Sequence, residues 1–218
     1  MRLQIVLLTC LLIACNTKQV SREIQDTIPK SEKVDFMKPY PELVERIDRK
    51  DSTKLNNYFK LVLATDSTCK IEWGNSKVKR VTADDYHFNI ALRFRVEWEN
   101  EEFLTLRAGT GTGAWFSLIL PLDSSARETT IQNTLAQNEK KNLVVAEQFP
   151  GTDTIMYIVN LKTNKVQFIT EKARCEAFHH NYLDTVILSD KNVYYKWSTP
   201  HRYVDNPKTV ERIVVVKI

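Results

Sequence analysis

The chain has 218 residues, a hydrophobic content of 43% and a formal net charge of +4. A chain of this length and apolar content can bury one substantial core. Its positive charge is small and dispersed, without the basic blocks typical of proteins that bind nucleic acids. We therefore expect a folded protein without a nucleic-acid partner.

The N-terminal segment has the features of an export signal. Arg2 supplies a positive charge, and an almost wholly apolar stretch follows it. That stretch is about 12 residues long, whereas a membrane-spanning helix needs roughly 17–25. The sequence therefore predicts a signal peptide over residues 1–14 and not a transmembrane anchor.

The segment ends in Leu12-Ile13-Ala14-Cys15, which resembles the lipobox of bacterial lipoproteins of the Bacteroidota type. The resemblance implies cleavage before Cys15, diacylglycerol on its thiol, and a further acyl chain such as palmitate on the new amine. Because one acyl chain binds a membrane only reversibly and two or three hold a protein there, Cys15 is expected to be a stable anchor.

The residues after the lipobox bear on location and spacing. Asn16 departs from the Asp that marks inner-membrane retention in enteric lipoproteins, and no acidic cluster follows Cys15. By this resemblance the expected location is the cell envelope, on the periplasmic face of the outer membrane. Residues 15–40 are polar and aperiodic and predict a flexible tether with a reach of about 25–30 Å.

Residues 41–218 are expected to form a single β-rich domain that opens with a short helix. Pro41 suits a first helical turn, Glu42 suits its positive end, and Leu43 and Ile47 share one face. Beyond this helix, short apolar runs are separated by turn residues, which is typical of strands. We expect strands over residues 58–64, 69–73, 115–120, 143–148, 154–161, 165–170, 185–189, 193–197 and 212–218.

The strongest β pattern lies in residues 88–98, where every even position is large and apolar. A period of two predicts one long half-buried strand, followed by a turn and a partner strand around residues 104–108. Pairing their apolar faces aligns Val96 with Leu104 and Phe94 with Leu106, and it places Arg93 opposite Arg107.

Taken together, these patterns predict an all-β fold, mainly an antiparallel meander, arranged as a sandwich, a barrel or a propeller-like stack. Residues 157–166 resemble the hairpin of a β-propeller blade. The resemblance is limited to this part of the chain, and the spacing of the later strands does not establish a repeat.

Two arginines are the first candidate site. Like charges directly opposite each other destabilise a sheet, so Arg93 and Arg107 require compensation. An intramolecular carboxylate would supply it, and an anionic ligand or the carboxylates of a partner are the functional alternative.

Two cysteines are the second candidate. Cys69 and Cys175 remain once Cys10 leaves with the signal peptide and Cys15 is lipidated. In an exported protein they could form a disulfide, which would stabilise the fold by about 4–5 kcal/mol, or they could be two separate buried thiols.

Motifs for catalysis, metals or cofactors are not found. The glycines of residues 109–113 could cradle a phosphate, but an apolar strand follows them and not a helix, which favours a hairpin or bulge. The histidines lack zinc-ligand spacing, and there is no nucleophile motif. We therefore name no catalytic residue, no metal ligand and no cofactor, and whether the chain is an enzyme stays open.

The function expected from the sequence is that of a membrane-anchored lipoprotein whose β-rich domain binds or scaffolds an envelope protein or a glycan. The tryptophans could stack on a glycan or pack in the core. The alternatives are an inhibitor or immunity-type lipoprotein, and a hydrolase whose site is assembled from distant residues.

Overall fold

The structure is a computed structural model that describes residues 38–111, 113–123, 126–148, 153–171, 181–198 and 209–218. The described part consists mostly of antiparallel strands, which form four sheets, and the predicted all-β fold is thereby confirmed. Cys15, the predicted tether up to residue 37, and Cys175 lie outside the described residues.

The first sheet has the strand order β1-β2-β3-β4, with β5 also pairing with β3. Two short helices, α2 and α3, flank it in the chain, and α2 confirms the predicted N-terminal helix. The elements are α2 (Pro41–Arg46), β1 (Asp51–Ser52), β2 (Tyr58–Leu63), β3 (Thr68–Gly74), β4 (Lys79–Val81), β5 (Tyr86–His87) and α3 (Phe88–Ala91).

Each of the next three sheets is a simple meander, in which strands pair in the order of the chain. The second sheet comprises β6 (Arg95–Glu99), β7 (Phe103–Gly109), β8 (Trp115–Pro121) and β9 (Thr129–Gln132). The third comprises β10 (Thr134–Asn138), β11 (Leu143–Glu147), β12 (Thr154–Asn160) and β13 (Val166–Thr170). The fourth comprises β14 (Leu183–Leu188), β15 (Asn192–Ser198) and β16 (Thr209–Val215).

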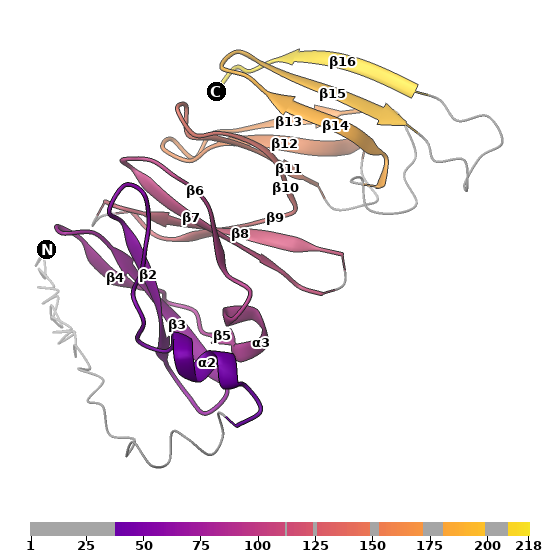
Figure 1. The fold of residues 1–218 in the computed structure, drawn as a ribbon. Helices are drawn as coiled ribbons and strands as arrows, with labels where there is room; N and C mark the ends of the chain where they lie inside the picture. Colours follow the sequence, from indigo (N-terminus) through magenta and orange to yellow (C-terminus); the bar gives the residue numbers. More distant parts are fainter. Residues whose placement is uncertain (1–37, 112, 124–125, 149–152, 172–180, 199–208) are drawn as a thin grey trace, which may run out of the picture.

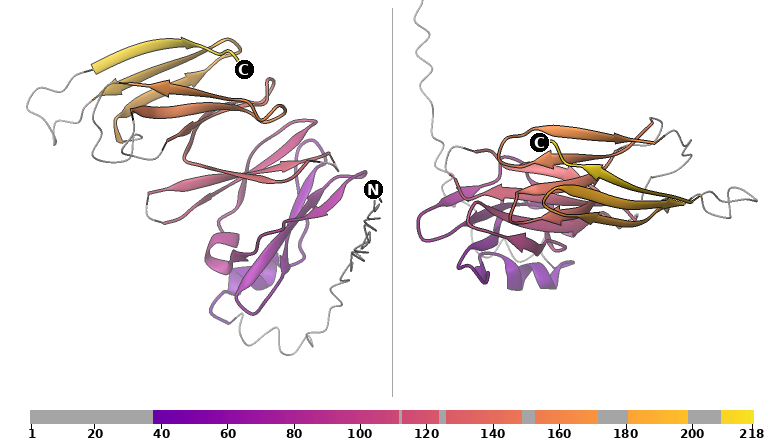
Figure 2. Two further views of the ribbon diagram at one scale, coloured as in Figure 1. Left: turned by 180° about the vertical axis from the view of Figure 1, so that it is seen from behind. Right: turned by 90° about the horizontal axis from the view of Figure 1, so that it is seen from above.

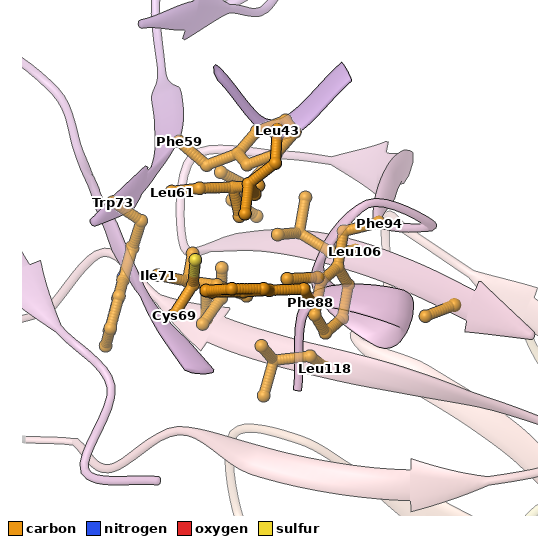
Figure 3. Close-up of a cluster of buried hydrophobic side chains, with 14 of the residues drawn as sticks. Leu43, Phe59, Leu61, Cys69, Ile71, Trp73, Phe88, Phe94, Leu106 and Leu118 are labelled. Carbon is orange, nitrogen blue, oxygen red and sulfur yellow. The ribbon is translucent and has the colours of Figure 1, made fainter. Parts of the chain in front are cut away.

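The sheets stack in chain order, from the indigo first sheet to the yellow fourth sheet, and the view from behind shows the same succession (Figures 1 and 2). A separate apolar core fills each interface. The core between the first and second sheets also receives Leu43 of α2 and Phe88 of α3 (Figure 3). A smaller core joins the second sheet to the third, and another joins the third to the fourth. The second and third sheets are thus inner layers.

A single bend connects the two inner sheets. β9 runs directly into β10 through Asn133, whose φ of 47° lies in the left-handed region that Asn tolerates better than most residues. The Asn133 N–H donates to the carbonyl of Trp115 on β8 (2.8 Å), while the Asn133 carbonyl accepts from the N–H of Glu147 on β11 (3.0 Å). This residue therefore belongs to both sheets and marks where they diverge.

The predicted strand over residues 88–98 is wrong. Its first part is helix α3, and only β6, Arg95–Glu99, is a strand. His87 caps the helix by accepting the Asn89 N–H, and Phe88 and Ala91 bury themselves three residues apart on one helical face. Phe88, Ala91 and Phe94 are three residues apart, which suits one face of a helix, while Phe88 and Phe94 also fit the period of two of a strand. The apolar spacing therefore did not distinguish a helix from a strand here.

The predicted register of the following hairpin is also wrong. Val96 pairs with Leu106, and Arg95 stands opposite Arg107 in the place expected for Arg93. A bulge between Val96 and Trp98 shifts the pairing, so that Trp98 then faces Thr105. The extra residue, Glu97, turns toward Arg107 and compensates for the paired arginines.

The remaining strand predictions correspond to β2, β3, β8 and β11 to β16, with ends that differ by a few residues. Five short or polar strands were not predicted from sequence: β1, β4, β5, β9 and β10. No helix in the described part of the chain combines the length and apolar character that crossing a bilayer requires.

Candidate functional site

A concave surface follows the seam between the two inner sheets. It consists of two hollows of about 470 and 580 Å³, which share Thr130 of β9 and Tyr157 of β12. We call them together the seam groove. Hollows of this size are in the range of ligand sites in proteins.

One wall of the seam groove is an apolar sheet face that the second sheet does not cover. Tyr157 and Val159 of β12 pack in the core between the inner sheets. Their cross-strand partners on β13 are Phe168 and Val166, which share that face but are 61% and 44% exposed. The third sheet therefore extends beyond the second by one strand, and its apolar face continues into solvent.

The opposite wall is the free edge of β9. Because Asn133 donates to Trp115, and residues of an antiparallel strand alternate in direction, Ile131 and Thr129 bond to β8. Thr130 and Gln132 then turn their N–H and carbonyl groups away from β8. These two residues line the first hollow together with Phe168 and Val166.

A buried polar pair closes the groove where the sheets diverge. The Asn133 side-chain amide donates to a carboxylate oxygen of Glu147 over 2.7 Å, and both residues are buried. The Asn133 side-chain carbonyl accepts the N–H of Trp115 over 3.2 Å. These bonds fix the bend of the chain and with it the opening between β9 and β13.

At its other end the groove carries an ion pair. The Lys162 ammonium donates to Glu102, and the Asn142 amide donates to the same carboxylate. The Lys162 bond holds the pKa of Glu102 below its usual value, since together with the Asn142 bond it outweighs the opposing effect of burial. Acidic and basic side chains both line this end of the groove, so its charge does not strongly favour an anionic or a cationic ligand.

Arg107 lies outside the seam groove, on β7 next to β6. Its guanidinium is 3.3 Å from a carboxylate oxygen of Glu97 and 4.8 Å from the ring centre of Trp115. The second oxygen of Glu97 accepts the Ser117 hydroxyl over 2.5 Å. Glu97 and Arg107 line a shallow hollow of about 490 Å³ that also touches Ile187 of the fourth sheet.

Arg93 lies apart from this network. Its guanidinium donates to the carbonyl of Gly109 over 3.0 Å and stands so close to Gly111 that a Cβ there would be 2.8 Å from it. The structure thus does not bring Arg93 and Arg107 opposite each other. Arg107 has the intramolecular carboxylate partner that was one of the two expectations, whereas Arg93 donates to a backbone carbonyl. Contact of either arginine with a ligand or partner stays a prediction.

Cys69 is fully buried in the core between the first two sheets (Figure 3). Burial raises the pKa of its thiol to about 12, and within the described residues it has no disulfide partner. Because Cys175 lies outside those residues, the Cys69–Cys175 disulfide stays a prediction.

The tryptophans add little to the site, and of the four histidines only His87 lies among the described residues. Trp73, Trp98 and Trp197 are buried, as expected for core residues, and Trp115 is partly covered by Arg107. Within the described ranges, no three His, Cys, Asp or Glu side chains gather in a way that could hold a metal ion.

Comparison of the chain with protein-family models, with curated proteins and with solved structures gave no match. The residues of the seam groove are therefore assigned from geometry alone.

Sequence reasoning did not find the seam groove. One signal for it exists in β13, where Val166, Phe168 and Ile169 put apolar side chains on both faces of an edge strand. Apolar side chains on both faces of an edge strand indicate that each face is covered, either by another sheet of the same chain or by a binding partner.

Proposed function

We propose that this chain is a lipoprotein, held on a membrane through lipidated Cys15, whose stacked sheets bind an envelope partner in the seam groove. The lipobox supports the anchor, and the uncovered wall formed by Val166 and Phe168 supports the binding site. An exposed Phe beside a hollow can serve as an anchor for a ligand, because covering it removes apolar surface from water.

The single observation that carries binding is the contrast within one sheet face. Tyr157 and Val159 are half-buried against the second sheet, while their neighbours Phe168 and Val166 are exposed beside unpaired strand backbone. A ligand with both apolar groups and hydrogen-bonding groups satisfies both walls. A catalytic role has no comparable support among the described residues.

The anchor is tested with Cys15→Ser in the natural host. We expect the variant to lose acyl labelling and to leave the membrane fraction. A variant that stays in the membrane fraction would contradict the anchor.

Binding in the groove is tested by affinity purification from detergent-solubilised membranes. We expect a partner in stoichiometric amount with the wild-type chain and with Ile213→Ser, a control at an apolar residue that is 70% exposed on the fourth sheet. Phe168→Ser is expected to lose that partner. Equal recovery from both variants, or no partner at all, would contradict the proposed site.

A further inference from the structure

We infer that the ligand of the seam groove is an extended polypeptide segment of another protein, which adds to β9 as an additional strand of the second sheet. This inference rests on the proposed function, since it names the class of partner for the same site. It is drawn from the edge of β9, from the treatment of other sheet edges and from the position of the open apolar wall.

The outer edge of β9 has unused backbone hydrogen-bonding groups. Thr130 and Gln132 present two N–H donors and two carbonyl acceptors along one edge, by the alternation that Asn133 sets. In the described part of the chain, no backbone bond from outside the β8–β9 ladder reaches either residue. Such a row of groups is a template for another strand.

Two other sheet edges in the described part of the chain carry features that hinder the addition of a strand. On β16 the Gln167 side-chain amide donates to the Val215 carbonyl (2.8 Å) and accepts from the Lys217 N–H (2.8 Å). That amide occupies the edge as a peptide group of a neighbouring strand would. On β6 the bulge after Val96 breaks the edge. β9 has neither device.

The space beside β9 fits one added strand. A strand paired with β9 would lie about 4.8 Å from it, and stacked sheets lie about 10 Å apart. It would therefore extend the second sheet over the open half of the third, where Phe168 and Val166 lie. Alternate side chains of the segment would point at these two residues, so apolar residues are expected at every second position.

The site fits a polypeptide better than a glycan. The rings of Tyr157 and Phe168 are 6.4 Å apart and inclined at 56°, so they do not form the flat platform on which a sugar stacks. Backbone donors and acceptors that alternate along a strand edge match another strand more closely than they match a sugar ring.

The test uses the full lipidated chain in detergent micelles and, as probe, decapeptides selected from a random display library. We expect binders with apolar residues at alternate positions. Methylating the amide nitrogens that face β9 should weaken binding by about tenfold or more, the loss of one or more hydrogen bonds, whereas methylating the intervening nitrogens should have little effect.

The matched protein variants are Thr130→Pro, which removes the outward N–H, and Thr130→Val, which keeps it. Only the proline variant should lose binding, and since N-methylation tests the peptide side, the result does not depend on that variant folding. Absence of peptide binders, or binders insensitive to the position of methylation, would overturn strand addition.

The two proposals fail in different ways. If Phe168→Ser abolishes binding of an envelope partner or an oligosaccharide while peptide methylation and Thr130→Pro have no effect, strand addition is overturned and the seam groove stands as a site. If neither Phe168→Ser nor Thr130→Pro changes any binding, both proposals are overturned.

Discussion

The side chain of Asn133 donates a 2.7 Å hydrogen bond to the carboxylate of Glu147, and both residues are buried where β9 turns into β10. One residue thus ends the second sheet and begins the third, and its bonds set the angle at which they separate. The seam groove exists because of that separation, so its geometry depends on this pair.

Substitution of Asn133 tests this dependence. Asn133→Gly keeps the freedom to adopt a positive φ and loses the side-chain bonds, which should lower the free energy of unfolding by about 1–3 kcal/mol. Asn133→Ala should cost about 1 kcal/mol more, because an L side chain is strained at that φ. Urea unfolding measures both, and equal stability of the two variants would contradict the strain.

The Glu97–Arg107 pair should stabilise the fold, although the sequence left a partner role open. Arg107→Ala leaves Glu97 almost buried without its cation, which should cost about 1 kcal/mol, more than a typical exposed pair. Arg107→Lys is the control that keeps the charge. In a double-mutant cycle with Glu97→Gln, we expect a measurable coupling energy, and additive effects would argue that the pair is not coupled.

Stability should fall in acid, in part through Glu99. Burial would raise the pKa of Glu99, but hydrogen bonds from Thr53, from Asn57 and from the Leu55 N–H together hold it below its ordinary value. In the unfolded chain the Glu99 carboxyl has an ordinary pKa of about 4.3. The stabilisation of the fold by ionised Glu99 is therefore present above about pH 4.3 and is lost as the pH falls below that value.

Urea midpoints at about pH 7 and pH 3.5 measure this effect. Glu99→Gln should be less stable than the wild type at neutral pH and should lose less on acidification. An identical pH dependence of the two chains would show that Glu99 does not contribute.

Cys69 should be unreactive in the folded chain. Its side chain is fully buried and its thiol pKa is raised to about 12, so the thiolate that attacks labelling reagents is scarce and inaccessible. In a Cys175→Ser chain, a maleimide should label Cys69 only after denaturation. Rapid labelling of the native chain would contradict its burial.

The same assay decides the predicted disulfide. Denatured wild-type chain, kept oxidised, should take up no maleimide at Cys69 and Cys175 if they are paired. It should take up label at both if they are separate thiols.

Most strands could be predicted from sequence because each has its own local pattern. Trp115 to Leu120 is a continuous apolar run, and it became β8 with two covered faces. Residues 88–98 misled because their apolar spacing serves a helix as well as a strand. The bulge at Glu97 has no sequence marker. Together with the turn that pairs Glu99 with Leu104, it sets the register in which Arg95, and not Arg93, lies opposite Arg107.

The candidate site could not be predicted, because it depends on how two sheets overlap. β9 reads Thr-Thr-Ile-Gln, which is short and polar and carries little strand signal by itself. In the sequence, Phe168 does not differ from other apolar strand residues, and its exposure is known only from the stacking of the sheets. Only the turn at Asn133 and the missing cover over β13 make these distant residues into two walls of one groove.

The most direct test of the binding site is photo-crosslinking in intact cells with a photoreactive phenylalanine analogue at position 168 or position 213. The seam groove predicts one discrete protein adduct from position 168 and none of the same mass from position 213. Absence of an adduct at position 168, or the same adduct from both positions, would contradict binding in the groove.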